Sequence, residues 1–214
     1  MVLWFRILVI SLILIKITMK RNTIGVTSFV TIALLYVLLS GCDKKSTNYG
    51  LNVIYMPSSA VSGGLNLNYP VPAGLDSATY NFTKDSLNNK VTVFLGVSVS
   101  GQQASNGFTV KVSVNKDTTN QIIAGKSIAN AILLPDNLYS LPTSVTVPAN
   151  MNSASFNLQI DDYNSFKTIC KGKMALLTVV INSPSNYSLN TNLNKTVVII
   201  DVNKLIGIKP YHIY

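Results

Sequence analysis

Two stretches decide the fold: VTVFLGVSV at residues 91–99 and FTVKVSV at residues 108–114. In both, every second residue is apolar, and most residues between them are polar or small. Successive side chains of a strand point to opposite faces of a sheet, so this period of two predicts strands with one buried face. The connection at 101–107 begins and ends with glycine, which favours a hairpin turn.

The same pattern extends along the chain. Residues 155–160 alternate in the same way, whereas 174–181 and 196–202 are apolar on both sides and should be central or covered strands. Shorter candidates lie at 51–56, 79–83 and 145–147. One short helix is expected, capped by Asp117 or Thr118 and reaching toward Ala131. We therefore predict an all-β sandwich of about seven to eight strands with at most one short helix. Its core should include Val93, Leu95, Val110, Val112, Phe156, Leu158, Leu176 and Val198.

Apolar residues concentrate in the first 41 positions of the 214-residue chain. Residues 19–41 have the order of a secretory signal, with a basic start, an apolar run and small residues at the end. Its end, Leu-Ser-Gly-Cys at 39–42, resembles the lipobox of bacterial lipoproteins. The resemblance implies cleavage between Gly41 and Cys42 and acylation of Cys42, which would attach the protein to a lipid membrane.

The alternative for this region is a transmembrane hairpin made of residues 3–15 and 24–39. The first of these runs is shorter than the roughly 20 residues that cross a bilayer. We therefore expect an over-extended start at 1–18, a lipoprotein signal peptide at 19–41, a tether at 42–50 and a sandwich domain at 51–214 with a short C-terminal tail. The predicted location is the cell envelope, lipid-anchored in the outer membrane, with its membrane face left open.

Charge disfavours a nucleic-acid partner. The formal net charge is +9, but 13 Lys and 8 Asp follow Gly41, which leaves five positive charges beyond the predicted cleavage site. No Arg lies in that part, although phosphate and guanine recognition depend heavily on the arginine fork. The lysines are also scattered rather than clustered. They are typical of solvated loops and edge strands.

Catalytic chemistry has few candidates. The chain holds no Glu, and its one His, His212, lies at the C-terminal end. Asp161 and Asp162 are neighbours at a predicted strand end, so their side chains should diverge and act as turn residues. If Cys42 is acylated, Cys170 stands alone and is expected to be a small buried residue. We expect no enzyme, no cofactor and no metal site.

Short motifs in the second half carry a resemblance to a known family. They are LLP at 133–135, Tyr139 and Leu141, VTVPAN at 145–150 and ASFNLQI at 154–160, with YSLN at 187–190 before the last strand. Together they resemble the Bacteroidetes lipid-anchored immunoglobulin-like domain of unknown function found at the N-terminus of polysaccharide-utilisation lipoproteins. The resemblance implies an immunoglobulin-like β-sandwich. It carries no catalytic residues across. Asn150 stands where the family usually has Gly, and Asn also tolerates a left-handed turn position.

Glycan binding is the first functional hypothesis. Sugar rings stack on exposed aromatic rings, and four aromatic residues lie in or beside predicted loops with Asn neighbours: Tyr139, Tyr163, Phe166 and Tyr187. The alternative for each is a tyrosine or phenylalanine at the edge of the core. The only Trp, Trp4, lies before the predicted cleavage site. The expected function is a non-catalytic binding or accessory module in glycan capture, with a polysaccharide as its partner. The second hypothesis is a structural adaptor that binds a neighbouring envelope protein.

Overall fold

The computed structural model describes residues 52–59, 67–76, 78–101 and 105–208. The predicted leader at 1–41, with Gly41, and the predicted tether at 42–50, with Cys42, lie outside these residues. Within the described residues, no helix is long and apolar enough to cross a membrane.

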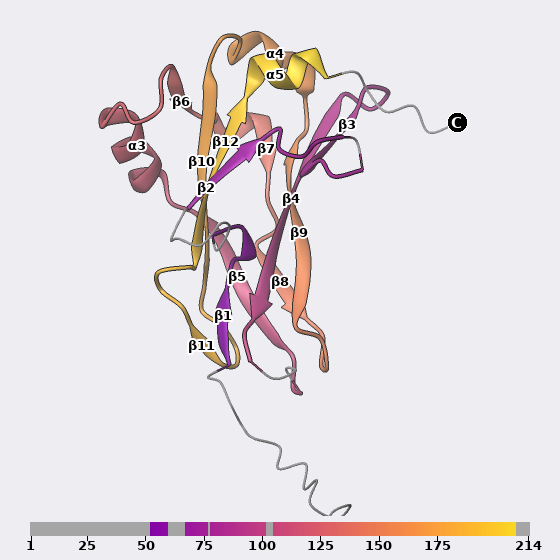
Figure 1. The fold of residues 1–214 in the computed structure, drawn as a ribbon, viewed down its shortest axis with the longest axis vertical. Helices are drawn as coiled ribbons and strands as arrows, with labels where there is room; N and C mark the ends of the chain where they lie inside the picture. The colour runs from indigo at the N-terminus through magenta and orange to yellow at the C-terminus, as the bar shows by residue number, and fades with distance from the viewer. Residues whose placement is uncertain (1–51, 60–66, 77, 102–104, 209–214) are drawn as a thin grey trace, which may run out of the picture. The chain divides into compact units, whose positions relative to one another are not determined.

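Two sheets of six strands form a sandwich (Figure 1). We call sheet A the one in which β11, β1, β4, β9 and β7 follow one another, with β3 also paired to β4. Its strands are β1 (Val53–Tyr55), β3 (Phe82–Asp85), β4 (Lys90–Val99), β7 (Tyr139–Ser140), β9 (Ser153–Ile160) and β11 (Ser188–Leu189). The long antiparallel ladder runs from Val91 opposite Ile160 to Ser98 opposite Ser153.

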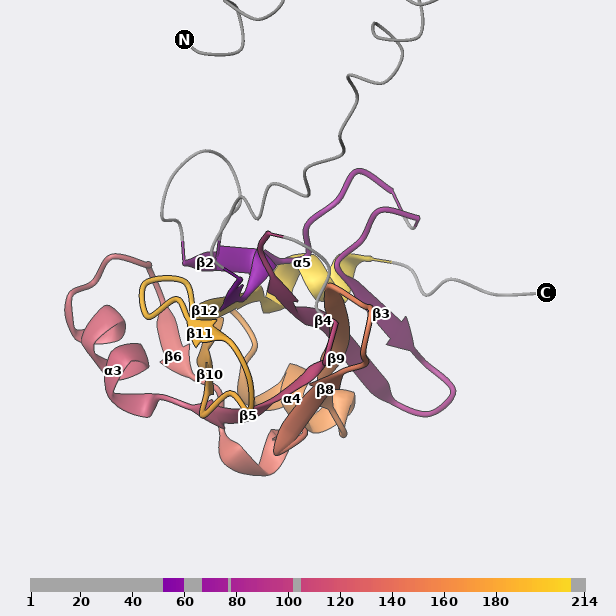
Figure 2. The same ribbon diagram turned by 90° about the horizontal axis from the view of Figure 1, so that it is seen from below.

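Sheet B has the order β2, β12, β10, β5, β8, and β6 also pairs with β10. Its strands are β2 (Asn68–Val71), β5 (Phe108–Val114), β6 (Ala131–Leu133), β8 (Ser144–Val147), β10 (Met174–Asn182) and β12 (Lys195–Asp201). The helices are α3 (Lys116–Ala124), α4 (Tyr163–Ile169) and α5 (Val202–Gly207), with 3-10 turns η1 (Pro57–Ser59) and η2 (Asp136–Leu138). In Figures 1 and 2, α3 lies beside β10 and β6, on the side of the molecule away from β4 and β9.

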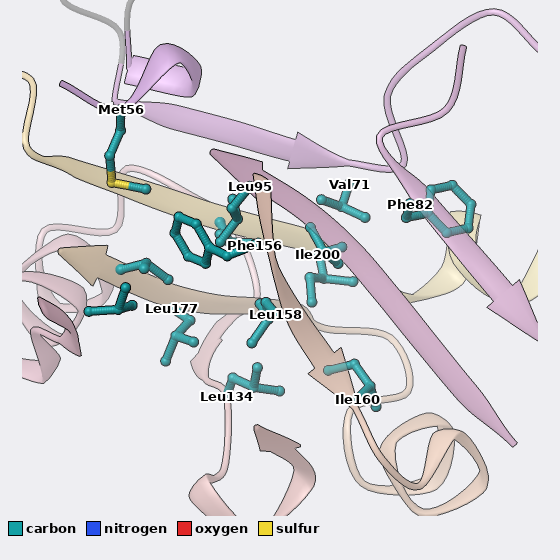
Figure 3. Close-up of a cluster of buried hydrophobic side chains, with 14 of the residues drawn as sticks. Met56, Val71, Phe82, Leu95, Leu134, Phe156, Leu158, Ile160, Leu177 and Ile200 are labelled. Carbon is teal, nitrogen blue, oxygen red and sulfur yellow. The ribbon is translucent and has the colours of Figure 1, made fainter. Parts of the chain in front are cut away.

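The core fills the space between the two sheets (Figure 3). Leu95, Phe156 and Leu158 of sheet A face Leu177 and Ile200 of sheet B. All eight residues predicted for the core are buried, and all except Leu176 belong to this core cluster. Burial on this scale contributes about 25 cal/mol for each Å² of apolar surface removed from water. The alternation in the sequence therefore identified the inward face of the long strands.

The sandwich prediction is confirmed, but the counts of its elements were too low. The described residues form twelve strands instead of seven to eight, because strands of two to four residues are too short to display a period of two. Three short α-helices occur instead of at most one. Helix α5 begins directly after β12, and α4 begins three residues after the last residue of β9. Asp201 and Asp162 cap them by accepting hydrogen bonds from backbone N–H groups. Their few residues carry no visible period of 3.6.

The predicted helix exists, with different ends. Its cap is Asn115, whose side chain accepts a hydrogen bond from Thr118 N, and not Asp117 or Thr118. The helix stops at Ala124, and Lys126 then adopts a left-handed φ of +53°. Residues from Ala131 onward pair with β10 as a parallel strand. The expected left-handed turn at Asn150 is present, with φ of +64°.

A buried pair of threonines fixes α3 on sheet B. Thr119 is fully buried, and its hydroxyl lies 2.8 Å from the hydroxyl of Thr178 on β10. The same Thr119 oxygen accepts a hydrogen bond from Thr178 N at 3.0 Å. A buried polar group stabilises a fold only when it is paired, so the position of α3 depends on this pair.

Replacing Thr119 by Val tests this dependence. Thr119→Val keeps the shape of the side chain but leaves Thr178 N–H without its acceptor and the Thr178 hydroxyl oxygen without its donor. We expect the free energy of unfolding to fall by about 1–3 kcal/mol, measured by urea denaturation. The matched control is Thr109→Val, which removes a hydroxyl pair with Thr146 at the exposed surface of the same sheet and should change stability by less than about 0.5 kcal/mol. Equal effects of the two variants would contradict the role assigned to Thr119.

Candidate functional site

The four aromatic residues predicted for ligand binding do not form one site. Phe166 has no exposed surface and Tyr163 is 6% exposed, because the cap at Asp162 starts α4 so that both rings point into the core. Their ring centroids are 6.5 Å apart. These two rings present no free face to a sugar, so the expectation of loop aromatics is corrected to core residues at these positions.

Tyr139 and Tyr187 are half-buried and lie far apart. Tyr139 belongs to β7, whereas Tyr187 immediately precedes β11, and these strands lie toward opposite ends of the sandwich (Figure 1). The Tyr139 hydroxyl donates to Asp136 at 3.2 Å, and burial together with that carboxylate raises the pKa of Tyr139 to about 12. The Tyr187 ring packs edge-on against Phe108, with centroids 5.8 Å apart. Both therefore match the alternative of aromatic residues at the edge of the core.

Two lysines lie over the face of Tyr163. Lys84 Nζ is 4.9 Å and Lys167 Nζ is 5.7 Å from the ring centroid. Lys84 also donates to the carbonyl of Ile208 at 2.9 Å, just beyond α5. Burial and, secondarily, the charge of Lys167 lower the pKa of Lys84. These contacts stabilise the junction of β3, α4 and α5, which gives the cluster a structural role.

The acidic pair at the end of β9 is also structural. Asp161 lies 3.9 Å from Lys90 Nζ, and Asp162 accepts hydrogen bonds from Ser165 and Asn89. Hydrogen bonds from Ser165 and then from Asn89 lower the pKa of Asp162, so it stays ionised as a helix cap. Cys170 is buried, and burial raises the pKa of its thiol. Among the described residues, no group of three His, Cys, Asp or Glu side chains could hold a metal ion.

An open groove of about 550 Å³ runs along the edge of the sandwich where β9 of sheet A approaches β8 of sheet B. None of the described residues that line it is charged. Six carry hydroxyl or amide groups: Ser140, Ser144, Thr146, Ser155, Asn157 and Gln159. Leu141 and Pro142, in the segment that crosses from sheet A to sheet B, add apolar surface.

The groove exists because β7 is very short. It pairs only with the last two residues of β9, Tyr139 with Ile160 and Ser140 with Gln159. The rest of the outer edge of β9 is left without a strand among the described residues. Strand β8 forms the edge of the other sheet at the same place. An uncharged surface of hydroxyls and amides can exchange hydrogen bonds with a polyhydroxylated ligand, and it offers no group for metal or phosphate chemistry.

Sequence reasoning missed this groove. Its polar side chains on β9 were visible as the outward half of the alternating pattern at 155–160. Their partners on β7 and β8 come from short strands, and only the three-dimensional pairing brings those strands beside β9.

Comparison with known proteins gives the family. A family model for N-terminal domains matches residues 52–188, more than half of the chain. The chain belongs to this family. The matched segment contains all of sheet A except Leu189, together with the groove, whereas β12 and α5 lie beyond it. No curated protein matches the chain.

Solved structures are similar to part of this chain. A protein of unknown function from Bacteroides ovatus is 21% identical, with a TM-score of 0.50 over 69% of this chain and 46% of its own. A proposed carbohydrate-binding protein from the same species is 15% identical, with a TM-score of 0.49 over 75% of this chain and 38% of its own. An auxiliary nutrient binding protein from Bacteroides thetaiotaomicron is 19% identical, with a TM-score of 0.45 over 69% of this chain and 44% of its own.

The chain therefore spans less than half the length of each of these three proteins. The family match, with the fold shared by the first of them, confirms the resemblance to a Bacteroidetes domain of unknown function.

The buried hydroxyl of Tyr163 supplies a test of the core assignment. Within the described residues it has no hydrogen-bond partner, and an unpaired buried hydroxyl destabilises the folded state. We expect Tyr163→Phe to raise the free energy of unfolding by up to about 1 kcal/mol, or to leave it unchanged, in chemical denaturation. Tyr139→Phe is the control, because it removes a bonded hydroxyl and should not stabilise. A loss of stability in Tyr163→Phe would contradict the burial of an unpaired hydroxyl.

Proposed function

We propose that the chain is a lipid-anchored module of the cell envelope that captures glycan and does not catalyse a reaction on it. The observation that carries this proposal is the uncharged, hydroxyl- and amide-rich groove at the open edge of the sandwich. Each sugar hydroxyl both donates and accepts hydrogen bonds, as do the Ser, Thr, Asn and Gln groups that line the groove. The resemblance to domains of polysaccharide-utilisation lipoproteins agrees with such a ligand.

A non-catalytic role is supported by the use of the acidic groups. Glycoside hydrolysis needs two carboxyl groups facing each other across the scissile bond. Of the candidate pair, Asp162 caps α4 and Asp161 pairs with Lys90. Neither lines the groove. The groove supplies hydrogen bonds and apolar contact, which are properties of recognition.

Binding without turnover is the direct test. The protein should be retarded in native gels that contain its polysaccharide, and incubation with that polysaccharide should release no new reducing ends. Asn157→Ala in the groove should weaken the retardation, whereas Asn137→Ala in the exposed turn η2 should not. If the unchanged protein releases reducing ends and Asp162→Asn abolishes that release, the non-catalytic proposal is overturned.

The proposed lipid anchor is inferred from the sequence motif that ends at Cys42. We expect Cys42→Ser to lose metabolic labelling with palmitate and to leave the membrane fraction. The matched control is Cys170→Ser, which replaces a buried thiol and should keep both properties. If Cys42→Ser still partitions with detergent as the unchanged protein does, residues 1–41 act as a membrane anchor instead.

The edge of β9 also favours a second candidate function, that of a protein adaptor. The edge of β9 from Ser153 to Leu158 lies beyond its pairing with β7, and such an edge can accept a strand from another protein. Crosslinking in intact cells distinguishes the two functions. A single protein partner recovered through β9, without retention by any polysaccharide, would favour the adaptor.

A further inference from the structure

None of the helices in the described part of the chain packs on the outer face of the middle of sheet A. Helix α3 packs on β10 and β6, and α5 packs on β12, all in sheet B. In Figure 2, α3 and β4 lie on opposite sides of the molecule. The middle of sheet A therefore presents a two-strand surface built by β4 and β9.

The register of β4 and β9 fixes the composition of this surface. Three pairs of outward residues lie directly opposite each other: Phe94 with Asn157, Gly96 with Ser155, and Ser98 with Ser153. We call these six residues the β4–β9 face. Ser155 and Asn157 also line the groove, so the face and the groove are continuous.

The β4–β9 face carries no charge. The nearest ion pair on this ladder joins Lys90 and Asp161. It lies outside the β4–β9 face, at the end of the ladder where Val91 pairs with Ile160. An anionic ligand would find no cation on the face itself, whereas hydroxyl and amide groups suit an uncharged one. The charge of the surface therefore matches a neutral ligand.

Phe94 supplies an aromatic ring. Its side chain is 38% exposed, although it stands in the middle of the longest strand. The backbone at this point is held by Tyr69 of β2, whose hydroxyl donates to the Phe94 carbonyl at 2.8 Å. An exposed ring on a fixed strand can stack with the flat face of a sugar, with little ordering required on binding.

Gly96 leaves space beside that ring. A Cβ built at Gly96 would lie 3.5 Å from the Ala154 carbonyl oxygen, an ordinary contact, and its backbone does not require glycine. Glycine is unfavourable inside a strand, and where it occurs there it often marks the close approach of a ligand or of another backbone. Packing within sheet A does not explain this residue, but the approach of a ligand to the backbone would.

We propose that the β4–β9 face binds a neutral polysaccharide strand. One sugar ring stacks on Phe94 and extends over the open backbone at Gly96, and its hydroxyls bond with Asn157 and Ser155. This deepens the proposed glycan function and rests on it, because it names the class of glycan and the surface that holds it.

The experiment uses the full-length chain in detergent and native gels containing dextran, pullulan, lichenan or polygalacturonate. Retardation by at least one of the three neutral polymers is expected. Phe94→Ala and Gly96→Val should each weaken it about tenfold or more. The control is Ile169→Ala, an exposed apolar residue on α4, which should leave binding unchanged.

Gly96→Val also separates a ligand role from a structural one. A β-branched residue is favoured in a strand, so this variant should lose binding while its Tm stays unchanged or rises by up to about 4 °C. A fall in Tm would show that the fold itself needs glycine and would overturn the ligand explanation for Gly96.

The outcomes of the gels are distinct. Neutral-polymer binding that survives in both Phe94→Ala and Gly96→Val would overturn the β4–β9 face as the site and leave the proposed glycan function in place. Retardation by polygalacturonate alone would overturn the neutral class. Absence of retardation in all four gels would overturn both the glycan function and this site.

Discussion

The antiparallel pairing of β4 with β9 is the interaction on which the rest of the structure depends. Eight residue pairs join strands separated by about 60 residues of sequence, from Val91 opposite Ile160 to Ser98 opposite Ser153. This ladder sets which side chains point inward, because a shift of one residue would exchange the buried and exposed sides of both strands. With the register fixed, Leu95 and Phe156 enter the core. Every strand of sheet A except β11 then pairs directly with β4 or β9.

The two sheets manage their outer faces in opposite ways. Helix α3 covers part of the outer side of sheet B, and the contact buries the polar pair Thr119 and Thr178. Sheet A keeps an outer side of small polar residues around Gly96. An antiparallel sheet can leave one face in water when that face is polar. The exposed ring of Phe94 departs from this pattern, which is why a ligand is the better account of that position.

The sequence predicted the long strands and their inward faces because the alternation of apolar and polar residues is a local property. It did not predict the short strands, since β7 and β11 have two residues each and become strands only through their partners. Helices α4 and α5 were missed for a related reason. Their start depends on Asp162 and Asp201 at strand ends, and an aspartate there is equally typical of a turn.

The aromatic candidates for ligand binding show a different limit of the sequence. Aromatic residues near Asn suggest sugar binding because both residue types suit sugars, but burial depends on the direction of each side chain. The cap at Asp162 turns Tyr163 and Phe166 inward, whereas the alternation along β4 turns Phe94 outward. The signal for Phe94 was present in the sequence, as a large apolar residue on the polar side of an alternating strand. Gly96, two residues later on the same side, strengthens that signal.

A shallow, uncharged surface also restricts how the protein can act. The groove is open and the β4–β9 face adds one exposed phenylalanine ring, so under the proposed function a single site would offer limited apolar contact to each sugar. Binding at one site should therefore be weak. Polysaccharides repeat the same unit many times, and a lipid anchor would hold many copies of the protein on one membrane. Under these conditions, one captured chain can be bound by several copies at once, and the combined affinity exceeds that of any single site by orders of magnitude. A regular β ladder with a neutral outer face is suited to this mode, because each copy presents the same row of side chains.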